Sequence, residues 1–365
     1  MITSVTIQNF KNLRHLEVGL GPLTVFVGPN ASGKTSVLEA VHLAVIAATG
    51  EPDQVFRYER HCDWLYTRGG SGDLSIACTT SGGTFFVTAT PPQTFPPQQT
   101  DLLGRGRWAF SVATDGAPSE DALRPTRPMV FLHLSGRQLA KASYSERTPP
   151  RVEYDGEGLA SVLAYMALND PDEFKKLGDM MRSLIPHLRR IRFSKVPVRR
   201  IEKEYLLFGD DTVERQSRRK YQGDSILFDF QNADNVPAHA VSEGTLMLLG
   251  LLTVLLGRVR PNILLMDDIE HGLHPLAQKS LLDVLKQVMQ IFQDLQIIAT
   301  AHSPYLLDQL QPEQIRLMAL DKDGYAVCGR LQDNPQFDKW KAEMAPGELW
   351  SLFGEKWLAE KGVAN

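Results

Sequence analysis

One short run of residues constrains the fold of this chain more than any other. Residues 28–35 read GPNASGKT and match G-x-x-x-x-G-K-[ST] at every fixed position. An apolar strand pattern, LTVFV, precedes the run, and a helical pattern from Gly33 to about Ala48 follows it. A glycine-rich turn between a buried strand and a helix N-terminus can wrap its backbone amides around phosphate groups. The run therefore predicts an α/β fold, with a mostly parallel sheet, built around a phosphate-binding loop.

The side chains of this loop have separate predicted roles. Lys34 is expected to reach the β and γ phosphates of a nucleotide, and Thr35 to hold Mg²⁺ through its hydroxyl. Asn30, Gly33 and Ser36 complete the set predicted to contact the phosphates. The expected ligands are therefore ATP and Mg²⁺. A chance glycine-rich turn is the alternative, and the strand and helix patterns on either side argue against it.

A second apolar strand pattern ends in acidic residues, in the run ILLMDDIEHGLHP at 263–275. An acid at the end of a strand beside the loop can reach the metal ion, and Asp267 has that place. Asp268, Glu270 or both are expected to orient the attacking water. A strand followed by an acidic turn is common in α/β proteins, so this prediction depends on the glycine-rich loop upstream.

Two further segments complete the pattern. His302 follows the apolar run LQIIATA, where its side chain could sense the γ-phosphate. Ser242, Glu243 and Gly244 open an apolar helix pattern, in which the serine can cap the helix and the glycine allows a phosphate to approach closely. Taken alone, each segment has an ordinary explanation, a structural histidine in one case and a simple helix cap in the other.

In the order glycine-rich loop, Ser-Glu-Gly, acidic strand end and histidine, these segments resemble the ATP-binding-cassette ATPases of the SMC, RecF and OLD group. The runs VTIQNFKNL, SEGT, DDIEHGLHP, AHSPYLLD and PGELWSLFGEKWL are similar to the OLD-like branch in particular. The resemblance covers about 1–49 and 241–357. It implies that two protomers sandwich two ATP molecules, each loop facing the Ser242–Gly244 segment of the partner. ATP would then hold the homodimer, or a higher assembly, together until hydrolysis releases it.

The chain departs from the family pattern at two positions. Asp268 stands where the family usually has glutamate, and its shorter side chain predicts slow hydrolysis, with Glu270 able to compensate. Glu243 stands where transporters have glycine, and its charge is expected to point away from the phosphate. The family also has a glutamine that reaches the metal site. Gln138 in HLSGRQLA is the candidate, and a surface helix residue is the alternative.

The spacing of the motifs predicts a P-loop ATPase head with a mixed sheet, split by an insertion. Residues 1–49 form the N-terminal lobe with the glycine-rich loop, and 50–240 contain the remaining strands of that lobe and a compact α+β arm. Residues 241–365 form the C-terminal lobe with the other three motifs. Because the insertion has no heptad repeat, a long coiled coil is not expected there.

Charge and composition narrow the functional classes. The net charge of -4 excludes a histone-like polycation, yet residues 182–220 contain twelve Lys/Arg and five Asp/Glu. This local basic patch could bind DNA phosphates, and a solvated face or a protein-docking surface is the alternative.

Three cysteines give no disulfide framework and no zinc spacing. The longest apolar run, 246–256, spans about half a bilayer as a helix, so a cytoplasmic protein with no membrane contact is expected.

The leading hypothesis is an ATPase switch that acts as sensor or regulator in bacterial antiphage defence or genome maintenance. OLD nucleases carry a Toprim domain, and the stretch after His302 is too short for one. No nuclease activity is therefore expected, and a separately encoded effector, such as a nuclease, would supply any cleavage. The pair Asp321 and Asp323 is expected to form a hairpin turn. A RecF-like DNA-repair ATPase, a transporter's energising subunit and a scaffold that binds ATP without turnover are the alternatives.

Overall fold

The computed structural model describes residues 1–48, 62–91, 109–115, 119–208 and 211–361. The chain forms two compact units, each made of segments that are distant in the sequence. The first unit consists of Met1–Phe131, Pro261–Glu270 and Gln278–Asn365, and the second of Leu132–Arg260 and His271–Ala277. These units cross the boundaries of the three blocks expected from the motif spacing, because the helix that follows Ser242 belongs with the insertion.

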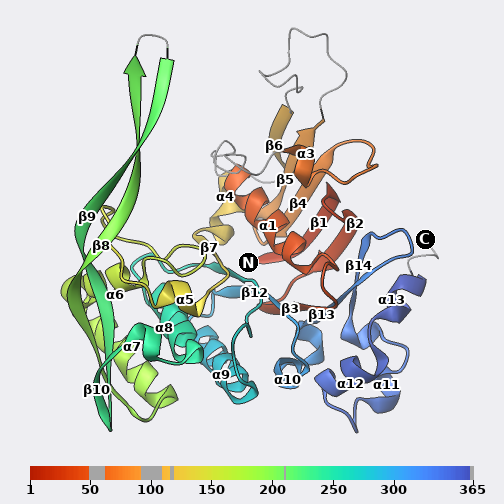
Figure 1. Ribbon diagram of the computed structural model, residues 1–365. Coiled ribbons are helices and arrows are strands. Elements are labelled where there is room, and N and C mark those ends of the chain that lie inside the picture. Colours follow the sequence, from red (N-terminus) through yellow and green to blue (C-terminus); the bar gives the residue numbers. More distant parts are fainter. Residues whose placement is uncertain (49–61, 92–108, 116–118, 209–210, 362–365) are drawn as a thin grey trace. The chain divides into compact units, whose positions relative to one another are not determined.

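The first unit is built around a six-stranded sheet with the strand order β14-β13-β3-β12-β11-β7 (Figure 1). Strands β3, β11, β12 and β13 are parallel, and β14 is antiparallel to β13. Parallel strands that are covered on both faces read as continuous apolar runs. This explains why LTVFV, ILLM and QIIATA lack alternation and are fully buried. The bounds are β3 (Leu23–Val27), β7 (Met129–Leu132), β11 (Ile263–Met266), β12 (Gln296–Ala301), β13 (Ile315–Leu320) and β14 (Ala326–Arg330).

A second sheet of the first unit is antiparallel, with the order β2-β1-β4-β5-β6. Its strands are β1 (Ile2–Phe10), β2 (Leu13–Gly19), β4 (Leu74–Thr80), β5 (Gly83–Thr90) and β6 (Ala109–Asp115). Helix α1 (Lys34–Ala48) shares one apolar core with both sheets. Val37, Leu38 and Val41 of the helix are completely buried in that core, so α1 has no solvent-exposed apolar stripe.

A buried glutamine connects the start of the chain to the central sheet. Gln296 of β12 is completely buried, and its Oε1 accepts a hydrogen bond from the backbone N–H of Ile2 at 2.8 Å. Its Nε2 donates to the carbonyls of Ile2 at 2.7 Å and Gly21 at 3.0 Å. Polar groups buried away from water need such partners, so Gln296 fixes the edge of β1 against β12.

Short helices surround the end of the chain, and the predicted terminal hairpin is present. In its turn, Asp321 Oδ1 accepts hydrogen bonds from the backbone N–H groups of Asp323 and Tyr325, both at 2.9 Å. Asp321 is therefore a turn residue, as expected. The helices of this unit include α3 (Cys62–Leu65), α4 (Ser119–Leu123), α9 (Pro275–Ile291), α10 (Pro304–Leu307), α11 (Phe337–Trp340), α12 (Pro346–Phe353) and α13 (Lys356–Lys361).

The second unit packs helices against a three-stranded sheet with the order β10-β9-β8. Helix α8 contacts α5, α6 and α7, while α6 contacts β9 and α7 contacts β8. Because helices surround it, α8 is apolar on nearly every face, and ten of its residues are buried. Among the described residues, no helix is long and apolar enough to cross a membrane. The bounds are α5 (Gly136–Leu139), α6 (Leu159–Asn169), α7 (Pro171–Leu184), α8 (Glu243–Leu255) and β10 (Ala233–Pro237).

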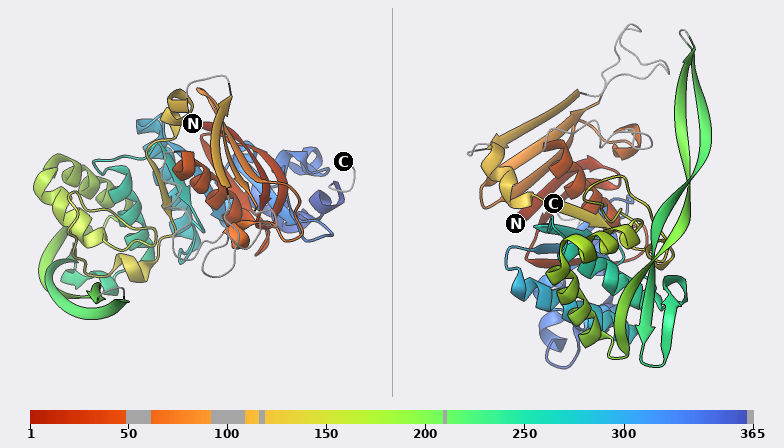
Figure 2. Two further views of the ribbon diagram at one scale, coloured as in Figure 1. Left: turned by 90° about the horizontal axis from the view of Figure 1, so that it is seen from above. Right: turned by 90° about the vertical axis from the view of Figure 1, so that its left-hand side faces the viewer.

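Strands β8 (Leu188–Phe208) and β9 (Asp211–Phe230) form one long antiparallel hairpin (Figures 1 and 2). Twenty-one residues of strand extend about 70 Å. The arm is free of coiled coil in its described part, as expected, but it is not compact, which corrects the sequence prediction. Charged residues interrupt the apolar alternation of this ribbon, so its sequence contained no clear strand signal. The stacked rings of Tyr144 and Tyr221, with centroids 4.4 Å apart, support its middle.

Candidate functional site

The glycine-rich loop joins β3 to α1, and two of its residues must be glycine for reasons of space. A Cβ at Gly28 would lie 2.1 Å from the carbonyl oxygen of Met318, and the residue has φ of +152°. A Cβ at Gly33 would lie 2.9 Å from the Cβ of Ala326, with φ of +95°. Both positions combine close contact with a backbone conformation that only glycine adopts without strain. The loop is thereby held against β13 and β14.

Lys34 is almost completely buried, with 4% of its surface exposed, and its ammonium lies along the loop. Its Nζ donates hydrogen bonds to the carbonyl oxygens of Gly28 at 3.0 Å and Pro29 at 2.8 Å. Burial lowers the pKa of Lys34, and the nearby carboxylates, with Asp268 first, oppose that shift. The loop therefore holds a cation at the place where phosphate charge is expected.

Asp267 ends the strand β11 and is fixed by two hydroxyl groups. Thr35 Oγ1 donates to Asp267 Oδ1 at 2.9 Å, and Thr300 Oγ1 donates to the same oxygen at 2.7 Å. Asp267 is buried. A hydroxyl and a carboxylate held side by side are the oxygen ligands that Mg²⁺ prefers. The structure thus brings together two of the three residues that were predicted to bind the metal, Thr35 and Asp267.

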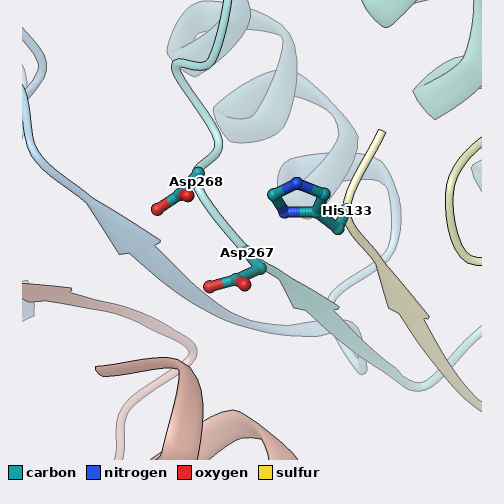
Figure 3. Close-up of side chains that lie close together, drawn as sticks. All are labelled: His133, Asp267 and Asp268. Atoms are coloured by element: carbon teal, nitrogen blue, oxygen red, sulfur yellow. The ribbon is translucent and has the colours of Figure 1, made fainter. Parts of the chain in front are cut away.

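Asp268 follows directly and has an unusual backbone conformation, with φ of +48°. Its backbone N–H donates to Thr300 Oγ1 at 2.7 Å, so one threonine orients both aspartates. Asp268 Oδ1 lies 3.4 Å from Nε2 of His302. Figure 3 shows the carboxylates of Asp267 and Asp268 at the end of β11. Left-handed backbone in a residue other than glycine is stored strain that frequently marks a functional site.

Glu270 is more deeply buried than Asp268, with 9% of its surface exposed. Its Oε1 accepts a hydrogen bond from the backbone N–H of His302. Burial raises the pKa of Glu270, and the hydrogen bond from His302 opposes that rise. A carboxylate with a raised pKa is a better proton acceptor than an ordinary surface glutamate. Glu270 therefore has the chemistry expected of a group that activates water.

His302 follows β12, and the charges of Lys34, Asp268 and Asp267 all act on its imidazole. Burial lowers its pKa, the positive charge of Lys34 lowers it further, and Asp268 opposes the change. The next residue, Ser303, donates a hydrogen bond from Oγ to Gln278 Oε1 at 2.6 Å. A histidine with a lowered pKa is neutral at pH 7, so one ring nitrogen can accept a proton or a hydrogen bond.

Two polar atoms of this site fit a phosphate group with a metal ion. Within the described part of the chain, Ser32 Oγ and Glu270 Oε2 are buried and have no hydrogen-bond partner. Buried polar atoms without partners are uncommon and are explained most simply by a bound ligand or water. Asn30 is exposed on the loop, and Ser36 is half-buried in the first turn of α1. The residues present therefore fit ATP and Mg²⁺.

The Ser-Glu-Gly segment and Gln138 both lie in the second unit. Ser242 caps α8, and its Oγ accepts a hydrogen bond from the N–H of Thr245 at 3.4 Å. Gln138 Nε2 donates to Asp155 Oδ2 at 2.6 Å, and its Oε1 is buried without a described partner. Its proposed contact with the metal stays a prediction. The carboxylate of Glu243 accepts a hydrogen bond from the backbone N–H of Gly136 at 2.8 Å; its predicted direction away from the phosphate stays a prediction.

Sequence reasoning missed Thr300 in the first unit and His133 in the second. Thr300, which orients both aspartates, is hidden inside an apolar strand run. His133 follows β7 as His302 follows β12, and its ring stacks on Tyr154 with centroids 5.9 Å apart. The position of a histidine after an apolar strand was the available signal.

A cavity of about 450 Å³ lies beside the loop, and no sequence pattern predicted it. Asn12, one of its lining residues, donates from Nδ2 to the carbonyl of Ala31 in the loop at 3.1 Å. Lys11, Arg68 and Tyr325 also line the cavity. These residues come from the start of the chain, from the stretch before β4 and from the terminal hairpin, so no local pattern connects them.

Two family models match separate parts of the chain. Residues 1–63 match the model of an AAA ATPase domain. Residues 130–308 match an AAA-domain model whose description names an AbiEii toxin and a type IV TA system. The first match contains the glycine-rich loop, and the second contains the Ser-Glu-Gly segment, the acidic strand end and His302.

Known proteins are similar to parts of the chain. The chain is 30% identical over 125 residues to the DNA replication and repair protein RecF of Acinetobacter baumannii. The matched stretch covers 29% of this chain and 34% of RecF. It is 42% identical over 45 residues to an OLD nuclease of Thermus scotoductus, 12% of this chain and 8% of that protein. The chain thus spans about one third of RecF. In fold it is similar to an SMC head bound to the C-winged helix domain of ScpA. That likeness has a TM-score of 0.56 and 15% identity, covering 92% of this chain and 99% of the head.

Proposed function

We propose that this chain, an ABC-type ATPase of the SMC, RecF and OLD group, is a molecular switch that dimerises around ATP and opens when ATP is hydrolysed. The observation that carries the proposal is the cluster of Lys34, Thr35, Asp267 and Glu270, which the fold gathers from two distant segments. Each member has the charge, burial or pKa shift that its role requires.

Within one protomer, the residues divide the chemistry. Thr35 and Asp267 would hold Mg²⁺, which when bound neutralises negative charge on the terminal phosphates. Lys34 binds the same phosphates from the loop. Glu270, whose pKa is raised by burial, accepts the proton of the attacking water, and Asp268 and His302 orient that water. Asp268 is strained and half-exposed, so it is the less suitable base.

The cavity beside the loop is proposed to take the base and ribose of ATP. It adjoins the loop through Asn12, and Tyr325 offers an aromatic ring to a flat base. Arg14 covers one side of that ring, with its guanidinium 5.1 Å from the ring centre. The pair would make a stable platform for stacking.

The dimer completes the site in this proposal. The capped N-terminus of α8, at Ser242 and Gly244, would bind the γ-phosphate held by the partner's loop. ATP would then favour the closed state, because only that state has both contacts. As a sensor in antiphage defence or genome maintenance, the dimer would act on a separately encoded effector. The resemblance to OLD-like ATPases supports this part of the proposal.

The test is ATP turnover by the purified protein, with Lys34→Ala as the blank and Ser242→Arg as a second variant. The wild type is expected to hydrolyse ATP slowly, and each variant about a hundredfold more slowly still. Mixing the two variants should restore part of the rate, because one of the two shared sites would then be intact. If Lys34→Ala hydrolysed ATP as fast as the wild type, the proposed ATPase activity of this site would be refuted. If the turnover rate per protomer did not depend on protein concentration and mixing the two variants restored no activity, the dimer would be refuted.

A RecF-like role on DNA is the second candidate, and the charges of the β8–β9 hairpin favour it. Near its base, Arg190 and Arg192 pair with Asp229, and Lys195 pairs with Asp224. Among the described residues no ion pair involves the four cations Arg199, Arg200, Arg218 and Lys220.

The register of the hairpin places Arg199 directly opposite Lys220. Like charges at such a position destabilise a sheet, and the phosphates of DNA would offset that cost. The double variant Arg199→Ala, Lys220→Ala should weaken duplex binding and reduce its salt dependence. The matched double variant Arg190→Ala, Lys195→Ala removes the same charge from the paired part of the hairpin and should change binding little. Equal losses for both double variants would count against this role.

A further inference from the structure

The side chain of Glu243 is held between two glycines of the second unit. Its Oε1 accepts a hydrogen bond from the backbone N–H of Gly136 at 2.8 Å. A Cβ at Gly136 would lie 2.6 Å from Glu243 Cγ, and a Cβ at Gly272 would lie 2.4 Å from Glu243 Oε2. Side chains do not pack that closely. Both positions therefore accommodate glycine alone as long as Glu243 keeps this conformation.

Gly272 lies just after the point at which the chain passes from the first unit to the second. Pro261–Glu270 is part of the first unit, whereas His271–Ala277 is part of the second, together with α8. The boundary between the units therefore falls on the peptide bond after Glu270. A displacement of residues 271–277 is transmitted to this glutamate through one covalent link.

The neighbouring residue of α8 makes a second contact with the same segment. A Cβ at Gly244 would lie 3.2 Å from Leu273 Cδ2 and 3.6 Å from the Cβ of Ala277. The first turn of α8 thus packs closely against residues 271–277 at two places, Glu243 against Gly272 and Gly244 against Leu273. Packed contacts of this kind move as a unit, because interiors are dense.

We propose that Glu243 is a positioning residue that ties the first turn of α8 to residues 271–277. A phosphate that binds at Ser242 and Gly244 would thereby change the position of the segment that follows Glu270. This inference rests on the proposed function, in which α8 contacts ATP. It would couple the phosphate contact of α8, in the second unit, to Glu270, in the first unit.

A simpler explanation is that Glu243 stabilises the positive end of the α8 macrodipole. That role needs a negative charge in the first turn and no particular direction of the side chain. The observed direction is specific, since one oxygen meets Gly136 and the other meets Gly272. It also keeps the carboxylate off the phosphate path, where like charge would be unfavourable.

The first test compares Glu243→Ala with Glu243→Gln by amide hydrogen exchange of residues 271–277, without nucleotide and with ATP. In the wild type, ATP should slow exchange in this segment. In Glu243→Ala, exchange should be faster and insensitive to ATP, and kcat should fall about tenfold while ATP affinity changes little. Glu243→Gln should restore the exchange pattern, because its amide oxygen can accept the same hydrogen bond from Gly136. Wild-type exchange and kcat in Glu243→Ala would overturn the inference.

The second test needs no nucleotide and is a double-mutant cycle on the free energy of unfolding. Gly272→Ala should destabilise the wild type more than it destabilises Glu243→Ala, because the added methyl meets Oε2 only when the glutamate is present. Gly324→Ala is the matched control: it also has positive φ, +83°, but open space around its Cβ. Its effect should add to that of Glu243→Ala. If the free-energy changes of Gly272→Ala and Glu243→Ala also added, the proposed coupling between these two residues would be overturned.

The two proposals fail in distinguishable ways. If wild-type turnover equals that of Lys34→Ala, the proposed function is wrong and the inference falls with it. If the wild type hydrolyses ATP and Glu243→Ala does so equally well with unchanged exchange, the switch stands and the positioning role alone is wrong.

Discussion

Thr35 and Asp267 are joined by a hydrogen bond of 2.9 Å between Oγ1 and Oδ1, although 232 positions separate them in the sequence. Thr300 donates to the same carboxylate oxygen at 2.7 Å. Three elements, α1, β11 and β12, therefore fix one carboxylate before any ligand binds. A group that is held in place by two hydroxyls does not need to reorganise when it meets a metal ion, which is the arrangement that favours catalysis.

Replacing Thr35 by valine should separate metal binding from folding. Valine keeps the shape of threonine but lacks the hydroxyl. The Mg²⁺ concentration for half-maximal turnover should therefore rise at least about tenfold, as metal affinity typically does when a group that supports a metal site is removed. The lost hydrogen bond should cost about 1 kcal/mol of unfolding free energy. Thr35→Ser keeps the hydroxyl and is the control. A Mg²⁺ titration that is the same for valine and serine would contradict the assigned role.

The raised pKa of Glu270 predicts how turnover depends on pH. If Glu270 accepts the proton from water, it acts only when ionised, so turnover should fall on acidification with a midpoint above the ordinary glutamate value of 4.5. In Glu270→Gln this acidic limb should disappear along with most of the activity. Asp268→Asn should keep the limb at a reduced rate. A pH–rate profile whose acidic limb disappears with Asp268→Asn instead would assign the base to Asp268.

The same pKa shift has a consequence for stability. The folded state binds the proton of Glu270 more tightly than the unfolded chain, because burial raises the pKa. Its contribution to stability is therefore present below the unfolded pKa and is lost as the pH rises through the folded pKa. Glu270→Gln should be more stable than the wild type at pH 7, and the difference should shrink near pH 4. Denaturant unfolding at both pH values measures this, and a difference independent of pH would contradict it.

The sequence predicted the central sheet and the candidate residues at its strand ends because their signals are local. Each strand that carries a functional residue is a short apolar run, and the residue follows it directly. Asp267 and His302 could therefore be assigned from position alone. The relation between Asp268 and Glu270 could not, since it depends on the burial of one and the strained backbone of the other.

Contacts between distant segments explain what the sequence did not reveal. The partner of Glu243 is Gly136, 107 positions earlier, and nothing in either local pattern points to the other. The long hairpin was missed for a different reason. Charged residues such as Arg199, Arg200 and Lys220, which are exposed, interrupt the apolar alternation that identifies a half-buried strand.

Tyr325 tests the cavity beside the loop. If the base of ATP stacks there, Tyr325→Leu should weaken ATP binding about fivefold, the scale of an aromatic contact. Binding of tripolyphosphate, which lacks a base, should be unchanged, because Lys34 and the loop are untouched. Tyr325→Phe keeps the ring and is the control. Calorimetric titrations that show equal losses for ATP and tripolyphosphate would mean that the substitution disturbs the loop and that the base binds elsewhere.

Gln296 gives a prediction about the fold itself. Leucine at this position would leave the N–H and carbonyl of Ile2 and the carbonyl of Gly21 without their partner, all in or near the buried junction of the two sheets. Because unsatisfied buried polar groups retain their full desolvation cost, Gln296→Leu should lose roughly 3 kcal/mol of unfolding free energy. Gln8→Leu, on an exposed site of β1, makes the same chemical change and should cost little. Equal denaturation midpoints for the two variants would show that water replaces the glutamine without loss.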